Sequence, residues 1–312
     1  MNFINRFKEK LSRKSQYDLQ SLKDEIKALA ILQNKLVICP NNTEENWLGI
    51  KNATLSMFPT QTFVIPQHFS NQIVSDHDLK VIIQFFKEIG GKTLILSGFP
   101  SYFFKIINIC LKAQIEVEVI FHGGLAELNQ SPVAQRRIQN ILNLAKSGEI
   151  NKIHVIKEGL DKLFSEITKI EVKRITPNIS IPSDVEIKNF DDGKVHIGIF
   201  GNNSYNKNRH SQVAAAFLIP NSVIHIIGQN EFSYLLNDDR IVSHKQLNRK
   251  KFLELLGSMD INLHCSYTES WGQVTMESLI LGVPCISGIN SGLQNIVSPE
   301  FKKCFITNID NP

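Results

Sequence analysis

The sequence predicts an α/β protein made of two Rossmann-like lobes that face each other across a cleft, with a helical extension at the N-terminus. Short, continuously apolar runs alternate with longer helical patterns over most of the chain, which is typical of parallel sheets covered on both faces. The alternation stops at residues 179–194 and then restarts. The length of 312 residues is enough for two domains that each bury a core.

The N-terminal extension, residues 1–34, is expected to be helical. Its first apolar residues recur at helical spacing: Phe3, Ile4, Phe7 and Leu11. Five basic residues lie among and just beyond them, within residues 1–14. Two interpretations remain open: a helix that packs on the protein core, or a basic amphipathic helix that binds an anionic membrane surface.

The first lobe is predicted over residues 35–180. Six apolar runs form its expected strands: 35–40, 62–66, 92–98, 117–124, 152–157 and 172–178. Helical patterns separate several of them, most clearly at 76–90 and 101–113.

A linker is predicted at residues 181–194, where Pro, Ser, Asp and Gly replace the apolar periodicity. The second lobe follows at 195–312. Its expected strands are 195–201, 222–228, 239–244, 260–265 and 283–288, with helices at 208–218, 248–258 and 272–281. Ligands of such sheets bind beyond the carboxyl ends of the strands, so the residues after each strand are the candidates for a site.

Composition excludes several classes of protein. The net charge of +4 is too small a surplus to indicate nucleic-acid binding. The five cysteines and the histidines lack the spacing of a metal site, and the cysteines are expected to be buried, reduced thiols. No apolar run approaches the roughly 20 residues of a membrane span, and the N-terminus lacks a secretory signal. We therefore expect a cytoplasmic location, with a peripheral place on the cytoplasmic membrane face as the further option.

The most specific segment runs from Ser266 to Gly288. Glu269 lies in the loop after a strand, and Glu277 lies in the second turn of the helix that begins near Gly272. The helix N-terminus is expected to offer free amides to a phosphate; they belong to Gly272, Gln273 and Val274. The two carboxylates are suited to accept hydrogen bonds from sugar and ribose hydroxyls.

This segment, ESWGQVTMESLILGVP, resembles the Glu-x7-Glu signature of the retaining GT-B glycosyltransferases (glycosyl transferases group 1). Trp271 stands at the aromatic position of the family pattern. The stretch 197–208 resembles the family's phosphate loop: Gly201 and Lys207 match it, and Asn202 replaces its diphosphate-binding Arg. Arg209 is the expected substitute for that arginine.

Two further stretches resemble the family more loosely. SGINSGLQNIV, residues 287–297, is similar to the family's glycine turn, and amides near Ser291 and Gly292 would meet the sugar or the diphosphate. VIFHGG, residues 119–124, is similar to a strand whose final histidine, here His122, lies near the transferred sugar.

The resemblance implies a hexosyltransferase-like enzyme that moves a sugar from a UDP or GDP sugar to a glycan or lipid-linked acceptor, as in polysaccharide biosynthesis. The first lobe, residues 35–180, would bind the acceptor. Configuration would be retained, and no metal or other cofactor would be needed. Lys207 would neutralise the diphosphate, Glu269 would hold sugar hydroxyls, and Glu277 would hold the ribose.

Two alternatives stay open at this point: a non-catalytic partner subunit with the same fold, and a nucleotide-sugar epimerase. The chain stops at Pro312, before the last helices that such enzymes usually fold back across the first lobe. We therefore expect either a truncated C-terminus or a short variant.

Overall fold

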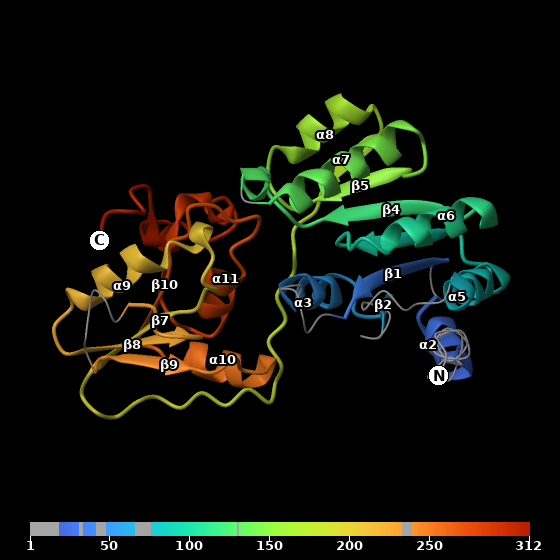
Figure 1. The fold of residues 1–312 in the computed structure, drawn as a ribbon. Helices are drawn as coiled ribbons and strands as arrows, with labels where there is room; N and C mark the ends of the chain where they lie inside the picture. The colour runs from blue at the N-terminus through green and yellow to red at the C-terminus, as the bar shows by residue number, and fades with distance from the viewer. Residues whose placement is uncertain (1–18, 31–33, 42–47, 66–75, 130, 233–238) are drawn as a thin grey trace, which may run out of the picture. The chain divides into compact units, whose positions relative to one another are not determined.

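The computed structural model describes residues 19–30, 34–41, 48–65, 76–129, 131–232 and 239–312. They form two compact units. Unit 1 holds most of the N-terminal half, and unit 2 comprises residues 176–312 together with two short stretches, 123–130 and 156–158. Each unit is an α/β structure built around its own parallel sheet (Figure 1).

Unit 1 contains a six-stranded sheet with the strand order β2-β1-β3-β4-β5-β6, in which every neighbouring pair is parallel. Its strands are β1 (Lys35–Pro40), β2 (Thr62–Ile65), β3 (Thr93–Ser97), β4 (Glu116–Phe121), β5 (Lys152–Val155) and β6 (Glu171–Arg174). Its helices are α2 (Leu19–Ala30), α3 (Leu48–Met57), α5 (Asp76–Glu88), α6 (Phe103–Ala113), α7 (Pro132–Lys146) and α8 (Leu160–Thr168).

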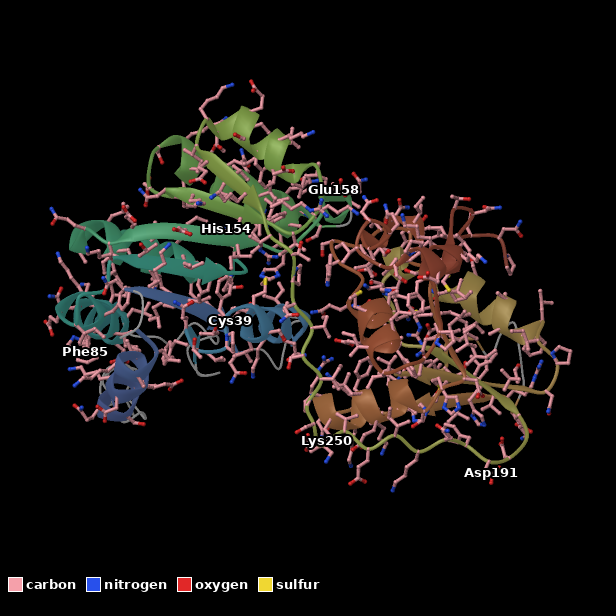
Figure 2. The ribbon with its side chains drawn as sticks, turned by 180° about the vertical axis from the view of Figure 1, so that it is seen from behind. Cys39, Phe85, His154, Glu158, Asp191 and Lys250 are labelled. Carbon is pink, nitrogen blue, oxygen red and sulfur yellow. The ribbon has the colours of Figure 1, made fainter. Side chains whose placement is uncertain are left out.

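The central strands of unit 1 are buried along their length because helices cover the sheet. All five residues of β3 are buried, as are the last five of β1 and of β4. Figure 2 marks Cys39 near the end of β1, where the thiol is buried. Burial raises the pKa of Cys39 to about 12, since a thiolate there would lose its hydration.

Unit 2 contains a second parallel sheet, in the order β12-β11-β10-β7-β8-β9. Its strands are β7 (Val195–Ile199), β8 (Ser222–Ile227), β9 (Ile241–His244), β10 (Ile261–His264), β11 (Cys285–Gly288) and β12 (Phe305–Ile306). Its helices are α9 (Arg209–Phe217), α10 (Arg249–Gly257) and α11 (Gln273–Ile280). Short 3₁₀ turns lie at η1 (Leu125–Asn129), η2 (Tyr205–Lys207), η3 (Ile289–Ser291) and η4 (Pro299–Cys304).

The predicted linker forms neither helix nor strand, but it is packed against unit 2. Ile181 and Val185 pack on the core cluster that includes Leu253 of α10. Lys250 of α10, labelled in Figure 2, forms an ion pair of 3.0 Å with Asp184. The linker sequence is therefore attached along α10, because its scattered apolar side chains find partners there.

The strand and helix predictions agree with the structure. Each apolar run predicted as a strand contains one, and the five helical patterns correspond to α5, α6, α9, α10 and α11. Helices α3, α7 and α8 and the short β12 had not been predicted. None of the described helices is long and apolar enough to cross a membrane. The predicted membrane-binding segment, residues 1–14, lies outside the described residues.

A row of three hydrogen-bonded histidines crosses β7, β8 and β9. His196 Nδ1 lies 2.8 Å from His225 Nε2, and His225 Nδ1 lies 2.8 Å from His244 Nε2. Asp192 accepts a hydrogen bond from His196 Nε2 at 3.0 Å, and the Phe190 ring stacks on the His196 ring.

The row of His196, His225 and His244 predicts that the folded chain loses stability in mild acid. Burial, and then the neighbouring His244 and His196, lower the pKa of His225 to about 4, although Asp192 raises it. The unfolded chain, whose histidines have a pKa near 6.5, binds a proton that native His225 rejects. Stability should therefore be complete above pH 6.5 and fall as the pH drops toward 4, by up to about 3 kcal/mol from this group.

Urea unfolding of the native chain and of His225→Gln between pH 7.5 and 4.5 measures this effect. The variant should lose stability less steeply with falling pH than the native chain, and the exposed His77→Gln should behave like the native chain. Identical slopes for native chain and His225→Gln would contradict the assignment.

Candidate active site

Glu269 is the centre of a charged cluster after β10. Its side chain is only 9 % exposed, and Oε1 accepts hydrogen bonds from Lys207 Nζ and, at 3.2 Å, from His264 Nε2. Burial by itself raises the pKa of Glu269. The charges and hydrogen bonds of His264 and Lys207 outweigh burial and lower the pKa to about 2. Glu269 is therefore ionised at neutral pH.

His264 connects this carboxylate to the core of unit 2. Its Nδ1 lies 2.9 Å from Thr275 Oγ1, and Thr275 Oγ1 donates to Ser287 Oγ at 3.1 Å. The residues of this series come from β10, α11 and β11, so the rigid sheet fixes the orientation of Glu269.

Glu277 is the second buried carboxylate. It lies in α11 with its side chain 3 % exposed, and Arg249 Nη1 at the start of α10 lies 2.8 Å from its Oε1. Burial raises the pKa of Glu277, while Arg249 acts in the opposite direction. One carboxylate oxygen thus has a cationic partner, and the other is left for a hydroxyl group.

The start of α11 differs from the prediction of three free amides. Gly272 N–H donates to Ser291 O at 3.1 Å, and Gln273 N–H donates to Trp271 O at 2.9 Å. Of the three predicted amides, only that of Val274 is left for a phosphate in the part of the chain that the structure describes. The chain folds tightly here: a Cβ on Gly272 would lie 2.9 Å from Leu293 and 3.0 Å from Ser291.

The loop after β7 brings Lys207 to Glu269. Gly201 lies beside Lys207, and a Cβ at position 201 would approach the Lys207 side chain to 3.2 Å. Asn202 instead stabilises its own loop, since its Oδ1 accepts hydrogen bonds from Ser204 N–H and Oγ–H. The loop thus positions the predicted cation, while Asn202 has a structural contact in place of the arginine of the family pattern.

Arg209, the expected substitute for that arginine, is the first residue of α9 and is only 3 % exposed. Its Nη1 lies 3.3 Å from Glu231 Oε1, and its guanidinium lies over the Phe232 ring. Among the described residues, its Nε and Nη2 are buried without a hydrogen-bond partner. Unpaired buried donors are rare, so these two are available to an anion that reaches the end of β7 or β8.

The turn after β11 also matches its predicted position. Gly292 has a φ of 77°, which suits glycine, and it ends the 3₁₀ turn of Ile289–Ser291. Within the described residues, the buried Ser291 Oγ and Trp271 Nε1 have no hydrogen-bond partner. Both groups come from segments that adjoin the start of α11.

His122 belongs to unit 1, where it follows β4. Its Nε2 lies 2.9 Å from Ser97 Oγ, and burial lowers its pKa to about 3, so the ring is neutral. The predicted contact of His122 with a sugar stays a prediction. In the described residues, no group of three or more His, Cys, Asp and Glu side chains could hold a metal ion.

Two residues of the site, His264 and Arg249, were missed in the sequence. The strand position of His264 favours a core-lining residue, and Arg249 carries no motif of its own. One signal was present for each: His264 is the last residue of the strand before Glu269, and Arg249 is the first residue of α10.

Comparisons with known proteins find relatives of the sequence and of the fold. Residues 180–311 match the family model Glycosyl transferases group 1, whereas a search of curated proteins gives no match. The structure resembles Anabaena HepE in complex with UDP and glucose, with a TM-score of 0.62, 14% identity, and coverage of 85% of this chain and 83% of that chain.

Two other solved structures share the fold. Sucrose-phosphate synthase from Thermosynechococcus elongatus has a TM-score of 0.57 and 14% identity, covering 85% of this chain and 84% of that chain. The pneumococcal O-GlcNAc transferase GtfA, in complex with UDP and GlcNAc, has a TM-score of 0.51 and 16% identity, covering 70% of this chain and 46% of that chain.

The match of residues 180–311 covers the whole cluster around Glu269 and Glu277. It bears out the predicted enzyme class, a glycosyltransferase, and the two parallel-sheet units bear out the predicted fold. The chain therefore has the GT-B fold, and its residues 180–311 are similar to the glycosyl transferases group 1 family.

Proposed function

We propose that the chain is a retaining glycosyltransferase that moves a sugar from a nucleotide diphosphate sugar to a glycan or lipid-linked acceptor. The observation that carries this proposal is the buried carboxylate of Glu269, held by Lys207 and His264 in the loop that leads to α11. The second buried carboxylate, Glu277, lies within α11 itself. Two buried carboxylates beside a cation suit a ligand that presents both hydroxyl groups and negative charge.

Glycosyl transfer passes through an oxocarbenium-like transition state while the leaving diphosphate gains negative charge. Lys207 would supply the opposite charge. In the structure its Nζ donates to Glu269 Oε1, so a bound diphosphate would compete with that carboxylate for the ammonium group. The Val274 amide and the unpaired Arg209 donors are the further groups proposed to stabilise the leaving diphosphate.

The two carboxylates would bind different parts of the donor. Glu269, a permanent anion, would accept hydrogen bonds from hydroxyls of the transferred sugar and place its anomeric carbon. Glu277 would accept the ribose hydroxyls with the oxygen that Arg249 does not use. His122 is proposed as a polar contact to the same sugar.

We propose a uridine nucleotide as the first donor to test. Complexes of HepE with UDP-glucose and of GtfA with UDP and GlcNAc support this choice. We further propose metal-free transfer, in which Lys207 and the backbone amides offset the charge of the diphosphate. Binding to an anionic membrane surface through residues 1–14 and a cytoplasmic location stay predictions.

Thermal unfolding of the full chain with UDP, GDP and their sugars tests the proposed function. A nucleotide that binds the native state raises the melting temperature, by mass action. We expect UDP or a UDP sugar to raise it at millimolar concentration. If no nucleoside diphosphate or nucleotide sugar does so, the proposed donor site is wrong.

Lys207→Ala is expected to weaken nucleoside diphosphate binding much more than monophosphate binding. The ammonium group would meet the β-phosphate, and a charge-assisted hydrogen bond of about 1.5–3 kcal/mol corresponds to roughly 10- to 100-fold in affinity. Calorimetric titration of both nucleotides measures the difference, with exposed Lys302→Ala as the control. An equal loss for both nucleotides would remove Lys207 from the diphosphate site.

A further inference from the structure

An exposed pair of tyrosines lies next to the charged cluster. Tyr205, in the 3₁₀ turn after β7, is 77% exposed. Its ring and that of Tyr267 have centroids 5.2 Å apart and an interplanar angle of 30°. An aromatic side chain this exposed, supported by a second ring, leaves one broad face open to a ligand.

The chain holds this pair close to the Lys207–Glu269 ion pair. Tyr205 lies two residues before Lys207, and Tyr267 lies two residues before Glu269, so each tyrosine Cα is within about 7 Å of the Cα of a member of that ion pair. Tyr267 N–H also donates to Asn206 O at 2.8 Å, which joins the two loops. The tyrosine pair is thus attached to the groups that would hold the transferred sugar.

Polar residues flank the two tyrosines along the chain. The same two loops and the turn after β11 provide Asn202, Ser204, Asn206, Thr268 and Asn290. Asn290 Nδ2 donates to Tyr267 O at 3.1 Å, so the third segment also supports the platform. An exposed aromatic face on loops rich in amides and hydroxyls suits a pyranose, which presents C–H groups on one face and hydroxyls around its rim.

A protein partner fits this surface less well. A specific protein interface buries about 800 Å² on each side around an apolar core. Here a single exposed aromatic ring has polar neighbours, so the surface matches a ligand of the size of one sugar ring.

We propose that Tyr205, stacked on Tyr267, binds a pyranose ring of the acceptor next to the Lys207–Glu269 pair. This proposal rests on the proposed function, which it deepens by making the acceptor a saccharide. Tyr205 determines acceptor affinity, and the donor nucleotide binds without it.

Saturation-transfer NMR on the full chain with UDP present tests the proposal. The probes are methyl glycosides of glucose, galactose and N-acetylglucosamine at millimolar concentration. At least one should receive saturation at its ring C–H protons from the native chain and from Tyr205→Phe, which keeps the aromatic face. Tyr205→Ala should weaken the affinity for that glycoside by about tenfold.

Leu218→Ala is the matched control, because Leu218 is another exposed apolar residue, at 70%, located at the other end of α9. UDP binding should be the same in all four proteins. The proposal is overturned if no glycoside binds the native chain, if Tyr205→Ala binds it equally well, or if that variant loses UDP affinity instead, as a base-stacking tyrosine would. The native chain could also bind a glycoside through Tyr205 and yet fail to bind UDP. That result would refute the proposed donor but would support the proposed role of Tyr205 in sugar binding.

Discussion

Glu269→Gln is expected to lower sugar transfer by about 10²-fold, the size of effect seen when one group that stabilises the transition state is removed. The glutamine keeps the size of the side chain but not the charge that orients sugar hydroxyls and balances the reaction centre. Product formation under saturating donor measures the loss. Since the pKa of Glu269 is about 2, the native chain should show no acid limb from this group above pH 4.

The same substitution should leave nucleoside diphosphate affinity unchanged or make it tighter. In the native structure Lys207 must leave the Glu269 carboxylate to meet a phosphate, and in Glu269→Gln that competitor has lost its charge. Exposed Glu300→Gln is the matched control and should keep native transfer. A Glu269→Gln protein with native transfer would exclude Glu269 from the reaction.

Arg249→Ala is expected to make nucleotide binding depend on pH. Burial raises the pKa of Glu277, and Arg249 is the neighbouring cation that lowers it. Without Arg249 the carboxyl group should be protonated at higher pH, and a protonated carboxyl group loses acceptor capacity for ribose hydroxyls. Affinity near pH 7 should fall by roughly 10- to 100-fold, as for a lost hydrogen bond to a charged group of about 1.5–3 kcal/mol.

The direction of the pH effect identifies its cause. Because alkali ionises the carboxyl group, affinity of Arg249→Ala should recover as the pH rises toward 9, while Glu277→Gln should stay weak throughout. Arg249→Lys keeps the charge and should resemble the native chain. Since losing one partner of a buried ion pair can cost about 3–5 kcal/mol of stability, titrations should be made below the unfolding temperature of each variant. A loss of affinity that does not change with pH would contradict this role for Arg249.

The sequence predicted the strands well because buried parallel strands are continuous apolar runs, such as Thr93–Ser97. The Glu-x7-Glu spacing also placed Glu269 before α11 and Glu277 inside it. Helix α8 was missed because Leu160–Thr168 has only nine residues, although its apolar residues Leu160, Phe164 and Ile167 recur at helical spacing.

The side chains that pair with the two carboxylates could not be predicted from the sequence. Arg249 precedes Glu277 by 28 residues, and only the packing of α10 on α11 brings them together. The bonded amides of Gly272 and Gln273 depend on the turn at Ser291 and on a local backbone bend. These contacts follow from tertiary packing, which local periodicity does not encode.

A crystal structure of the full chain with a nucleoside diphosphate, UDP first, tests the central claim most directly. The account predicts the ribose hydroxyls at Glu277, the β-phosphate at Lys207 in place of its bond to Glu269, and the phosphates near the Val274 amide. A nucleotide bound elsewhere on the chain, with the Lys207–Glu269 and Arg249–Glu277 pairs undisturbed, would contradict it.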